Sequence, residues 1–184
     1  MIDDAVSWAR QPGSGKYAKL ERERRFLLTD MPAQAKDPRL IEDRYLVGTR
    51  LRLRRVEADS QVVYKFCQKV RPDEANPSTV AITNIYLAEA EYERLRQLPA
   101  TILRKTRRLW QVGQQSFAVD KFHGDLAGLL LAEIELPDLA QSLLLPAPIG
   151  REVTTDDRFS GGYLAHATPT QKEQLLTLAR SEAR

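Results

Sequence analysis

The chain has 184 residues, of which 42% are hydrophobic and 29% charged, and its formal net charge is +3. This length is typical of one domain with a sizeable core, and so small a net charge excludes the polycationic character of a nonspecific nucleic-acid binder. No apolar stretch approaches the roughly 18 residues that a membrane helix needs, and none near the start resembles a signal peptide. A single cysteine, Cys67, excludes an internal disulfide and favours a reducing compartment. We therefore expect a cytoplasmic protein without a membrane partner.

Residues 1–16 have the composition of a flexible leader, and residues 17–184 are expected to form one domain. The segment Gly13-Ser14-Gly15-Lys16 is similar in composition to a phosphate-binding P-loop. That loop needs a glycine five residues before its second glycine, and a serine or threonine after the lysine. Arg10 and Tyr17 occupy those two positions, so the comparison fails.

Alternation of apolar and polar side chains with a period of two dominates the chain from residue 18 onward and predicts strands. The strands are expected near residues 18–28, 46–56, 61–70, 78–87, 101–109, 115–123, 130–136 and 149–154. Helical periodicity predicts helices over 88–98 and 170–183 and a short helical turn over 138–144. Many strands, few helices and short links favour a barrel or a sandwich.

The charged side chains of these strands repeatedly share one face. A solvated sheet face explains any single strand of this kind, but here two Glu-x-Glu pairs stand far apart in sequence, with basic strands between them. The side chains that share a face are Glu21, Glu23 and Arg25; Arg50, Arg52 and Arg54; Lys65, Cys67 and Lys69; Lys105 and Arg107; and Glu133 and Glu135.

Closure of the sheet would bring the strands of the two Glu-x-Glu pairs together and turn the charged faces inward. Four carboxylates make a hard-oxygen site that suits Mg²⁺ or Mn²⁺. Inward lysines and arginines would be costly to bury without counter-charges. A metal ion together with a multiply charged phosphate chain would balance both sets, so the pattern indicates a polyphosphate site.

The same residues resemble, in order, the motifs of the CYTH superfamily, the triphosphate tunnel metalloenzymes. Leu20–Phe26 is similar to the family's Glu-x-Glu-x-Lys strand, and the later motifs follow at Thr49–Arg54, Gln68-Lys69, Lys105–Arg107, Val119–Gly124, Leu131–Leu136, Glu152–Thr154 and Asp157–Phe159. The resemblance implies a mainly β fold over residues 17–184, a closed eight-stranded antiparallel β-barrel with a few flanking helices.

The resemblance also implies roles for the charged side chains. The ligands of one or two divalent cations, Mg²⁺ or Mn²⁺, would be Glu21, Glu23, Glu133 and Glu135. The phosphate-binding residues would be Arg52, Arg54, Lys65, Lys69, Lys105, Arg107 and Arg158. Arg25, Lys69 and Asp120 are the catalytic candidates, with Asp120 positioning a water molecule or a basic side chain. A metal-activated water would then attack the terminal phosphorus.

Arg25 departs from the family pattern, which usually has lysine at this position. A guanidinium is bulkier than an ammonium, is always charged and presents its donors as a fork, so the exchange is not neutral at a phosphate site. It could alter substrate choice, slow turnover, or mark a protein that binds polyphosphate without cleaving it.

The expected substrate is inorganic triphosphate or a small organic or nucleoside triphosphate, hydrolysed at its terminal phosphate. A class IV adenylate cyclase or a thiamine triphosphatase on the same fold, and a noncatalytic polyphosphate-binding module, are the alternatives. A nucleic-acid-binding barrel would carry aromatic residues on its basic face. Here Tyr64 and Phe66 lie opposite Lys65 and Lys69, so no nucleic-acid partner is expected, whereas barrel edges could pair in a homodimer.

Overall fold

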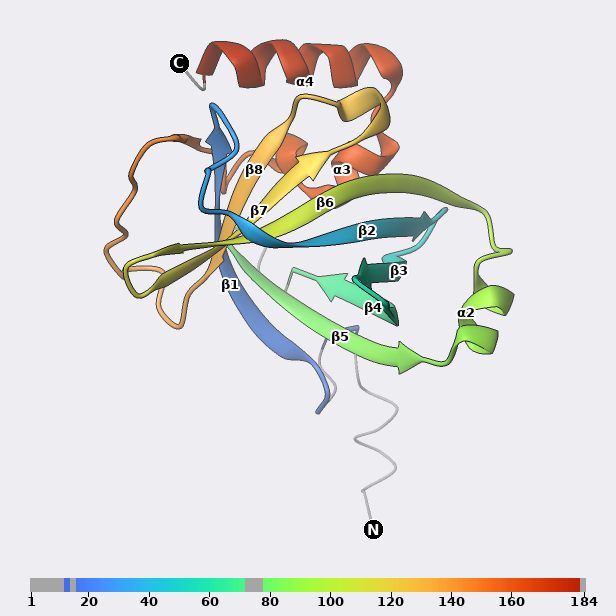
Figure 1. Ribbon diagram of the computed structural model, residues 1–184. Coiled ribbons are helices and arrows are strands. Elements are labelled where there is room, and N and C mark those ends of the chain that lie inside the picture. The colour runs from blue at the N-terminus through green and yellow to red at the C-terminus, as the bar shows by residue number, and fades with distance from the viewer. Residues whose placement is uncertain (1–11, 14–15, 72–77, 183–184) are drawn as a thin grey trace.

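The computed structural model describes residues 12–13, 16–71 and 78–182, and its centre is a ring of antiparallel strands (Figure 1). The strands are β1 (Lys19–Leu28), β2 (Lys36–Leu46), β3 (Leu51–Ala58), β4 (Gln61–Val70), β5 (Thr79–Leu87), β6 (Ala100–Val112), β7 (Gln115–Phe122), β8 (Leu130–Glu135) and β9 (Ile149–Glu152). Their order is β5-β4-β3-β2-β6-β7-β8-β1-β9, and a further pairing of β5 with β1 closes the first eight into a barrel. The predicted closed eight-stranded antiparallel β-barrel is confirmed, with β9 as an additional strand.

Strand β1 closes the barrel because it pairs with different neighbours along its length. Its first half pairs with β5, where Glu21 lies opposite Val80. Its second half pairs with β8, where Glu23 lies opposite Glu135. Closure therefore places the two Glu-x-Glu segments on adjacent strands, as the sequence predicted.

The barrel keeps a charged interior because part of its apolar core lies outside the ring. Outward-facing side chains of β1, β6, β7 and β8, among them Phe26, Trp110 and Ala132, form one buried cluster that Leu143 and Ile149 help to cover. A second cluster lies beneath the helices at one end of the barrel and includes Phe122 and Leu131. Apolar burial is thus achieved without filling the barrel, which leaves room for charged side chains on its inner faces.

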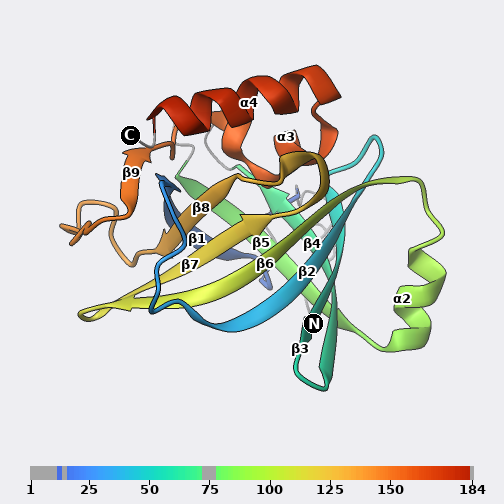
Figure 2. The ribbon, with the colours of Figure 1, turned by 45° about the horizontal axis from the view of Figure 1, so that its top comes forward.

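Helices cover one end of the ring. In Figure 2, α3 (Gly161–His166) and α4 (Pro169–Glu182) lie over the same end of the barrel, while α2 (Glu89–Leu95) links β5 to β6 at the side. Leu175 and Ala179 of α4 pack into the cluster beneath them. Two 3-10 turns, η1 (Gly124–Leu126) and η2 (Asp157–Phe159), complete this end.

Most predicted strands are confirmed with small shifts at their ends, but β2 was missed. The strand predicted over 46–56 joins the end of β2 to the start of β3, across a turn in which Gly48 has a φ of +72°. Residues 36–46 carry charges on both faces, and Leu40 is 44% exposed, so no apolar alternation reveals a strand.

The helices were predicted in part. The helix ranges predicted over 88–98 and 170–183 correspond to α2 and α4, whereas α3 was not foreseen. The helical turn predicted over 138–144 is wrong, because that segment forms turns and irregular backbone. None of the helices in the described part of the chain is long and apolar enough to cross a lipid bilayer. The predicted leader, residues 1–16, lies almost entirely outside the described residues.

Candidate functional site

The interior of the barrel is a cavity of about 540 Å³ with an excess of positive charge. Four glutamates line it, namely Glu21, Glu23, Glu133 and Glu135. Nine cationic side chains line it as well, namely Arg25, Arg50, Arg52, Arg54, Lys65, Lys69, Arg71, Lys105 and Arg107. The shared parity predicted for the charged residues is therefore real, and the inward faces of β1, β3, β4, β6 and β8 meet in one cavity.

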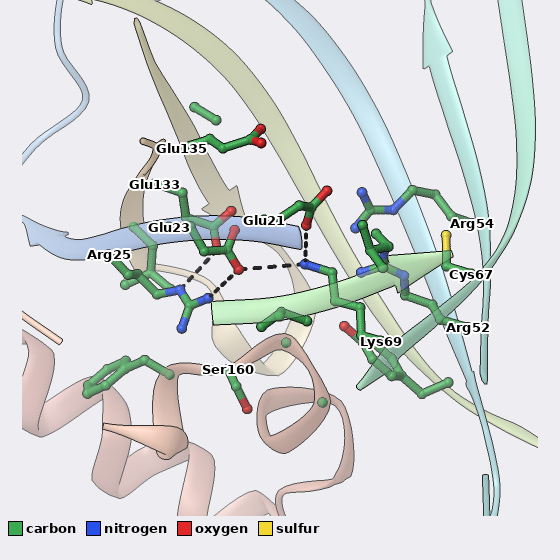
Figure 3. A pocket seen from close by; sticks show the side chains of 18 of the residues that line it. Glu21, Glu23, Arg25, Arg52, Arg54, Cys67, Lys69, Glu133, Glu135 and Ser160 are labelled. Atoms are coloured by element: carbon green, nitrogen blue, oxygen red, sulfur yellow. Dashed lines mark hydrogen bonds and ion pairs between the residues drawn. The ribbon is translucent and has the colours of Figure 1, made fainter. Parts of the chain in front are cut away.

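Arg25 lies between carboxylates of the two acidic strands, as Figure 3 shows. Its Nε donates to Oε1 of Glu133 at 2.9 Å, and its Nη2 is 3.5 Å from Oε1 of Glu23. Only 12% of the side chain is exposed. Burial acts to lower the pKa of Arg25, but Glu133 and Glu23 offset it and leave the pKa raised, so Arg25 is a permanent cation in the cavity wall.

Glu133 is engaged by a second arginine. Arg107 Nη2 donates to its other oxygen, Oε2, at 2.6 Å. Burial alone would raise the pKa of Glu133, but the guanidiniums of Arg25 and Arg107 hold that pKa well below its usual range. Glu133 is therefore ionised and hydrogen-bonded through both oxygens.

The remaining glutamates have weaker ionic contacts. Lys69 Nζ lies 3.1 Å from Oε2 of Glu21 and 3.6 Å from Oε1 of Glu23 (Figure 3). Glu135 is exposed and makes no ion pair within the described residues. The carboxylates of β1 and β8 are thus neutralised by the protein's own cations to different degrees.

A buried aspartate supports the basic strand β3. Asp43 of β2 is 1% exposed and accepts two hydrogen bonds from Arg54, at 2.6 Å from Nε and 2.7 Å from Nη2. Arg52 Nε lies 3.4 Å from the same carboxylate, and the side chain of Arg52 is 11% exposed. Burial acts to raise the pKa of Asp43, but Arg52 and Arg54 hold it well below its usual range.

A second buried aspartate, Asp120, supports the basic strand β6. It lies beneath the cavity wall, 1% exposed, and contacts Lys105 Nζ at 2.5 Å. Arg107 donates to both of its oxygens, at 2.7 Å from Nε and 2.6 Å from Nη2. Burial lowers the pKa of Lys105, and Asp120 offsets this only in part. Asp120 does not line the cavity, so of its two predicted roles its position fits the support of a basic side chain.

The structure places the other predicted residues as follows. Lys65 lines the cavity with its Nζ 5.1 Å from the centre of the Tyr86 ring, and Cys67 faces the same space with its Sγ 2.8 Å from Oδ1 of Asn84.

Arg158 does not line the cavity. It donates to both oxygens of Asp156, from Nε at 2.9 Å and from Nη2 at 2.7 Å, in a half-exposed position. The structure therefore does not bring Arg158 to the predicted phosphate site.

Sequence reasoning missed two charged residues of the site. Asp43 was missed because strand β2 was missed. Arg71 lines the cavity and continues the parity of Lys65, Cys67 and Lys69, so the alternation could have identified it.

The four glutamates are the candidate ligands of a metal ion. Their donor chemistry suits a hard divalent cation, since carboxylate oxygens are the ligands that Mg²⁺ and Mn²⁺ prefer. In the described part of the chain, however, no three acidic, histidine or cysteine side chains converge on one point. The ion pairs with Arg25, Arg107 and Lys69 explain this, because they hold three of the four carboxylates. The carboxylates fit the ion by their chemistry, and binding through all four would require Lys69 to leave Glu21 and Glu23 and the two arginines to release an oxygen of Glu133.

Comparisons with known proteins agree with this geometry. No family model matches the chain. An inorganic triphosphatase from Acetivibrio thermocellus is 43% identical over 63 residues, which are 34% of this chain and 40% of that protein's length. A crystal structure of the hypothetical protein NE1496 has 25% sequence identity and a TM-score of 0.57, over 81% of this chain and 99% of that one.

A second crystal structure, of the inorganic triphosphatase NE1496, has 24% identity and a TM-score of 0.56, over 81% of this chain and 96% of the other. At this identity the likeness shows the fold. The ordered motifs, the closed barrel with its charged interior and these similarities lead to one conclusion. The chain has the triphosphate tunnel fold, and its ordered motifs resemble those of the CYTH superfamily.

Proposed function

We propose that the chain hydrolyses the terminal phosphate of inorganic triphosphate or of a small organic or nucleoside triphosphate, with Mg²⁺ or Mn²⁺ as cofactor. The observation that carries this proposal is the charge of the cavity, where nine lysine and arginine side chains face four glutamates. Asp43 and Asp120 offset part of this positive charge from behind the cavity wall. The excess that remains is costly unless an anion of several charges binds among the cations. A triphosphate has that charge and an extended shape.

Arg52 supports an anionic ligand directly. Its Nε is buried and has no hydrogen-bond partner within the described residues, although Asp43 lies near enough for ionic attraction. A buried donor without a hydrogen-bond partner costs free energy, so the protein alone does not fully satisfy Arg52. Arginine suits this role because its planar fork matches phosphate oxygens.

The buried aspartates orient the cations before the substrate arrives. Asp43 holds Arg54, and Asp120 holds Lys105 and Arg107, each through short contacts in a site of low exposure. Cations that are already oriented need little reorganisation when charge develops on the transferred phosphoryl group. We propose that Arg54, Lys105 and Arg107 bind the phosphate oxygens and stabilise their charge.

The carboxylates of β1 and β8 are the proposed metal ligands, namely Glu21, Glu23, Glu133 and Glu135. When bound there, the cation would polarise a phosphate oxygen and lower the pKa of a water molecule. Lys69, which contacts Glu21 and Glu23, would then be released to donate to the substrate. Arg25 is proposed to contribute a fixed positive charge beside the reacting phosphate.

Relatives support triphosphate hydrolysis over the alternatives. A partly matching protein and a protein of the same fold are both named inorganic triphosphatases. Thiamine triphosphate hydrolysis, adenylate cyclase activity and polyphosphate binding without cleavage are the other uses that the same cavity would permit. The cytoplasmic location, the absence of nucleic-acid and membrane partners, and a homodimer stay predictions from the sequence.

The test is phosphate release from inorganic triphosphate, ATP and thiamine triphosphate, each with Mg²⁺, Mn²⁺ or EDTA. Glu21→Gln is the test variant, and Glu173→Gln on the exposed surface of α4 is its matched control. We expect release that needs metal, collapses in Glu21→Gln and persists in Glu173→Gln, and the best substrate identifies the activity. Binding of triphosphate without release would contradict hydrolysis, and cyclic AMP formed from ATP would identify a cyclase instead.

A further inference from the structure

Arg71 differs from the other cavity cations in the partner that holds it. It follows β4 directly and lines the cavity, one inward position beyond Lys69. Its Nη2 contacts Oδ1 of Asp157 at 2.5 Å, and the side chains of Arg71 and Asp157 are 34% and 59% exposed. Asp157 belongs to η2, so this ion pair joins the end of β4 to the turn that precedes α3.

The exposure of the partner decides how firmly a cation is held. Asp43 binds Arg54, and Asp120 binds Arg107. Each of these aspartates is only 1% exposed, so water cannot easily solvate its carboxylate if the arginine leaves. Asp157 can be solvated as soon as Arg71 leaves. An ion pair that is open to water contributes little net stability, so Arg71 exchanges its partner more easily than Arg54 or Arg107 does.

The position of Arg71 would allow it to contact a substrate after it leaves Asp157. Inward side chains on a strand repeat every two residues, about 6.6 Å apart, so Lys65, Lys69 and Arg71 form a row along the cavity wall. Phe159, which belongs to η2 as Asp157 does, also lines the cavity. Arg71 therefore extends the row of phosphate-binding cations on the side where η2 borders the cavity.

We propose that Arg71 is a further substrate-binding residue, which pairs with Asp157 before the substrate binds and then transfers to a phosphate oxygen. This inference rests on the proposed function, in which triphosphate occupies the cavity. Asp157 competes with the substrate for one guanidinium, so its carboxylate lowers the affinity of the site. Removal of Asp157 should therefore raise the affinity for triphosphate, and removal of Arg71 should lower it.

The experiment is isothermal titration of the full chain with inorganic triphosphate in EDTA, where binding is observed without turnover. Asp157→Asn should tighten binding by about two- to fivefold, the range set by an exposed ion pair. Arg71→Met should weaken it by about tenfold or more, as expected for the loss of a charge-assisted hydrogen bond. In the double variant the Asp157 substitution should have no further effect.

Asp125→Asn is the matched control. Asp125 is an exposed aspartate in the other 3-10 turn, and it pairs with Lys172 at 3.1 Å outside the cavity lining. Its substitution should leave triphosphate affinity unchanged. Tighter binding in Asp157→Asn cannot result from damage to the fold, which would weaken binding.

Two results would overturn the inference, and they differ in what else they imply. Unchanged or weaker binding in Asp157→Asn, with a wild-type protein that binds triphosphate, would show that the Arg71–Asp157 pair is only structural. Absence of triphosphate binding by the wild-type chain would overturn both this inference and the proposed function.

Discussion

Asp43 and Arg54 form a two-point ion pair across β2 and β3, with Nε–Oδ1 and Nη2–Oδ2 distances of 2.6 and 2.7 Å. The carboxylate is 1% exposed, and the guanidinium lines the cavity. Asp43 therefore links the stability of the barrel wall to the direction in which a phosphate-binding cation points.

Replacement of Asp43 by asparagine should lower both stability and substrate affinity. Loss of one partner of a buried ion pair typically costs about 3–5 kcal/mol, because the other charge stays buried. Denaturant unfolding should show this loss, and triphosphate affinity should fall by about tenfold or more because Arg54 is no longer oriented. Glu42→Gln is the control, since Glu42 pairs with the exposed Arg104 on the outer face of the same strand. That substitution should cost at most about 1 kcal/mol, and equal losses in the two variants would contradict the role of Asp43.

Asp43 should also contribute to acid unfolding. Its pKa in the folded state is held well below its usual range, so the folded state binds this proton less readily than the unfolded state. Its stabilisation is therefore complete above an unfolded pKa of about 3.9 and is lost as the pH falls through the folded-state pKa. Unfolding free energies measured below about pH 4 should fall more steeply for the wild type than for Asp43→Asn. Parallel curves would show that Asp43 does not contribute.

The lowered pKa of Lys105 predicts that triphosphate affinity and protein stability change at alkaline pH. Burial lowers its pKa, so it should lose its charge below about pH 10.4, the ordinary value for lysine. Triphosphate affinity should decrease as the pH rises through that lowered pKa. The free energy of unfolding should instead increase with pH between the folded-state and unfolded-state pKa values of Lys105. In that range the unfolded state binds more protons than the folded state. Titrations from pH 7 to pH 10 should therefore show a smaller loss of affinity in Lys105→Arg, and an identical loss in that variant would exclude Lys105 as its source.

Gly161 is required by its contact with Tyr45. A Cβ placed on Gly161 would overlap the hydroxyl oxygen of Tyr45, whereas the ring carbon Cζ would be 3.5 Å away, an ordinary contact distance. Gly161→Ala should therefore destabilise the protein by about 1–3 kcal/mol, as overpacking does. In a Tyr45→Phe background, which lacks the hydroxyl, the same substitution should cost much less. Equal costs in the two backgrounds, measured by thermal unfolding, would disprove the steric explanation.

The sequence predicted the parts of the site that depend on strand parity. Glu21 and Glu23, Lys65 and Lys69, or Glu133 and Glu135 must share a face, because side chains two residues apart in a strand point the same way. Parity also held for Arg71, although that residue was overlooked. Strand β2 gave no such signal, since its charges lie on both faces.

The sequence alone determined a mainly β chain with its acids and bases selected by face, because that selection is local and repeats with the pleat. Only the tertiary structure decided which charges neutralise which. Closure of β1 onto β5 and β8 brought Glu23 opposite Glu135, and the packing of β2 against β3 brought Asp43 beneath Arg54. Ion pairs between residues far apart in sequence depend on strand order, register and burial, which no local pattern contains. Tertiary structure also decides how exposed each aspartate is. Asp43 and Asp120 are buried and hold their cations, whereas Asp157 is exposed and can release Arg71.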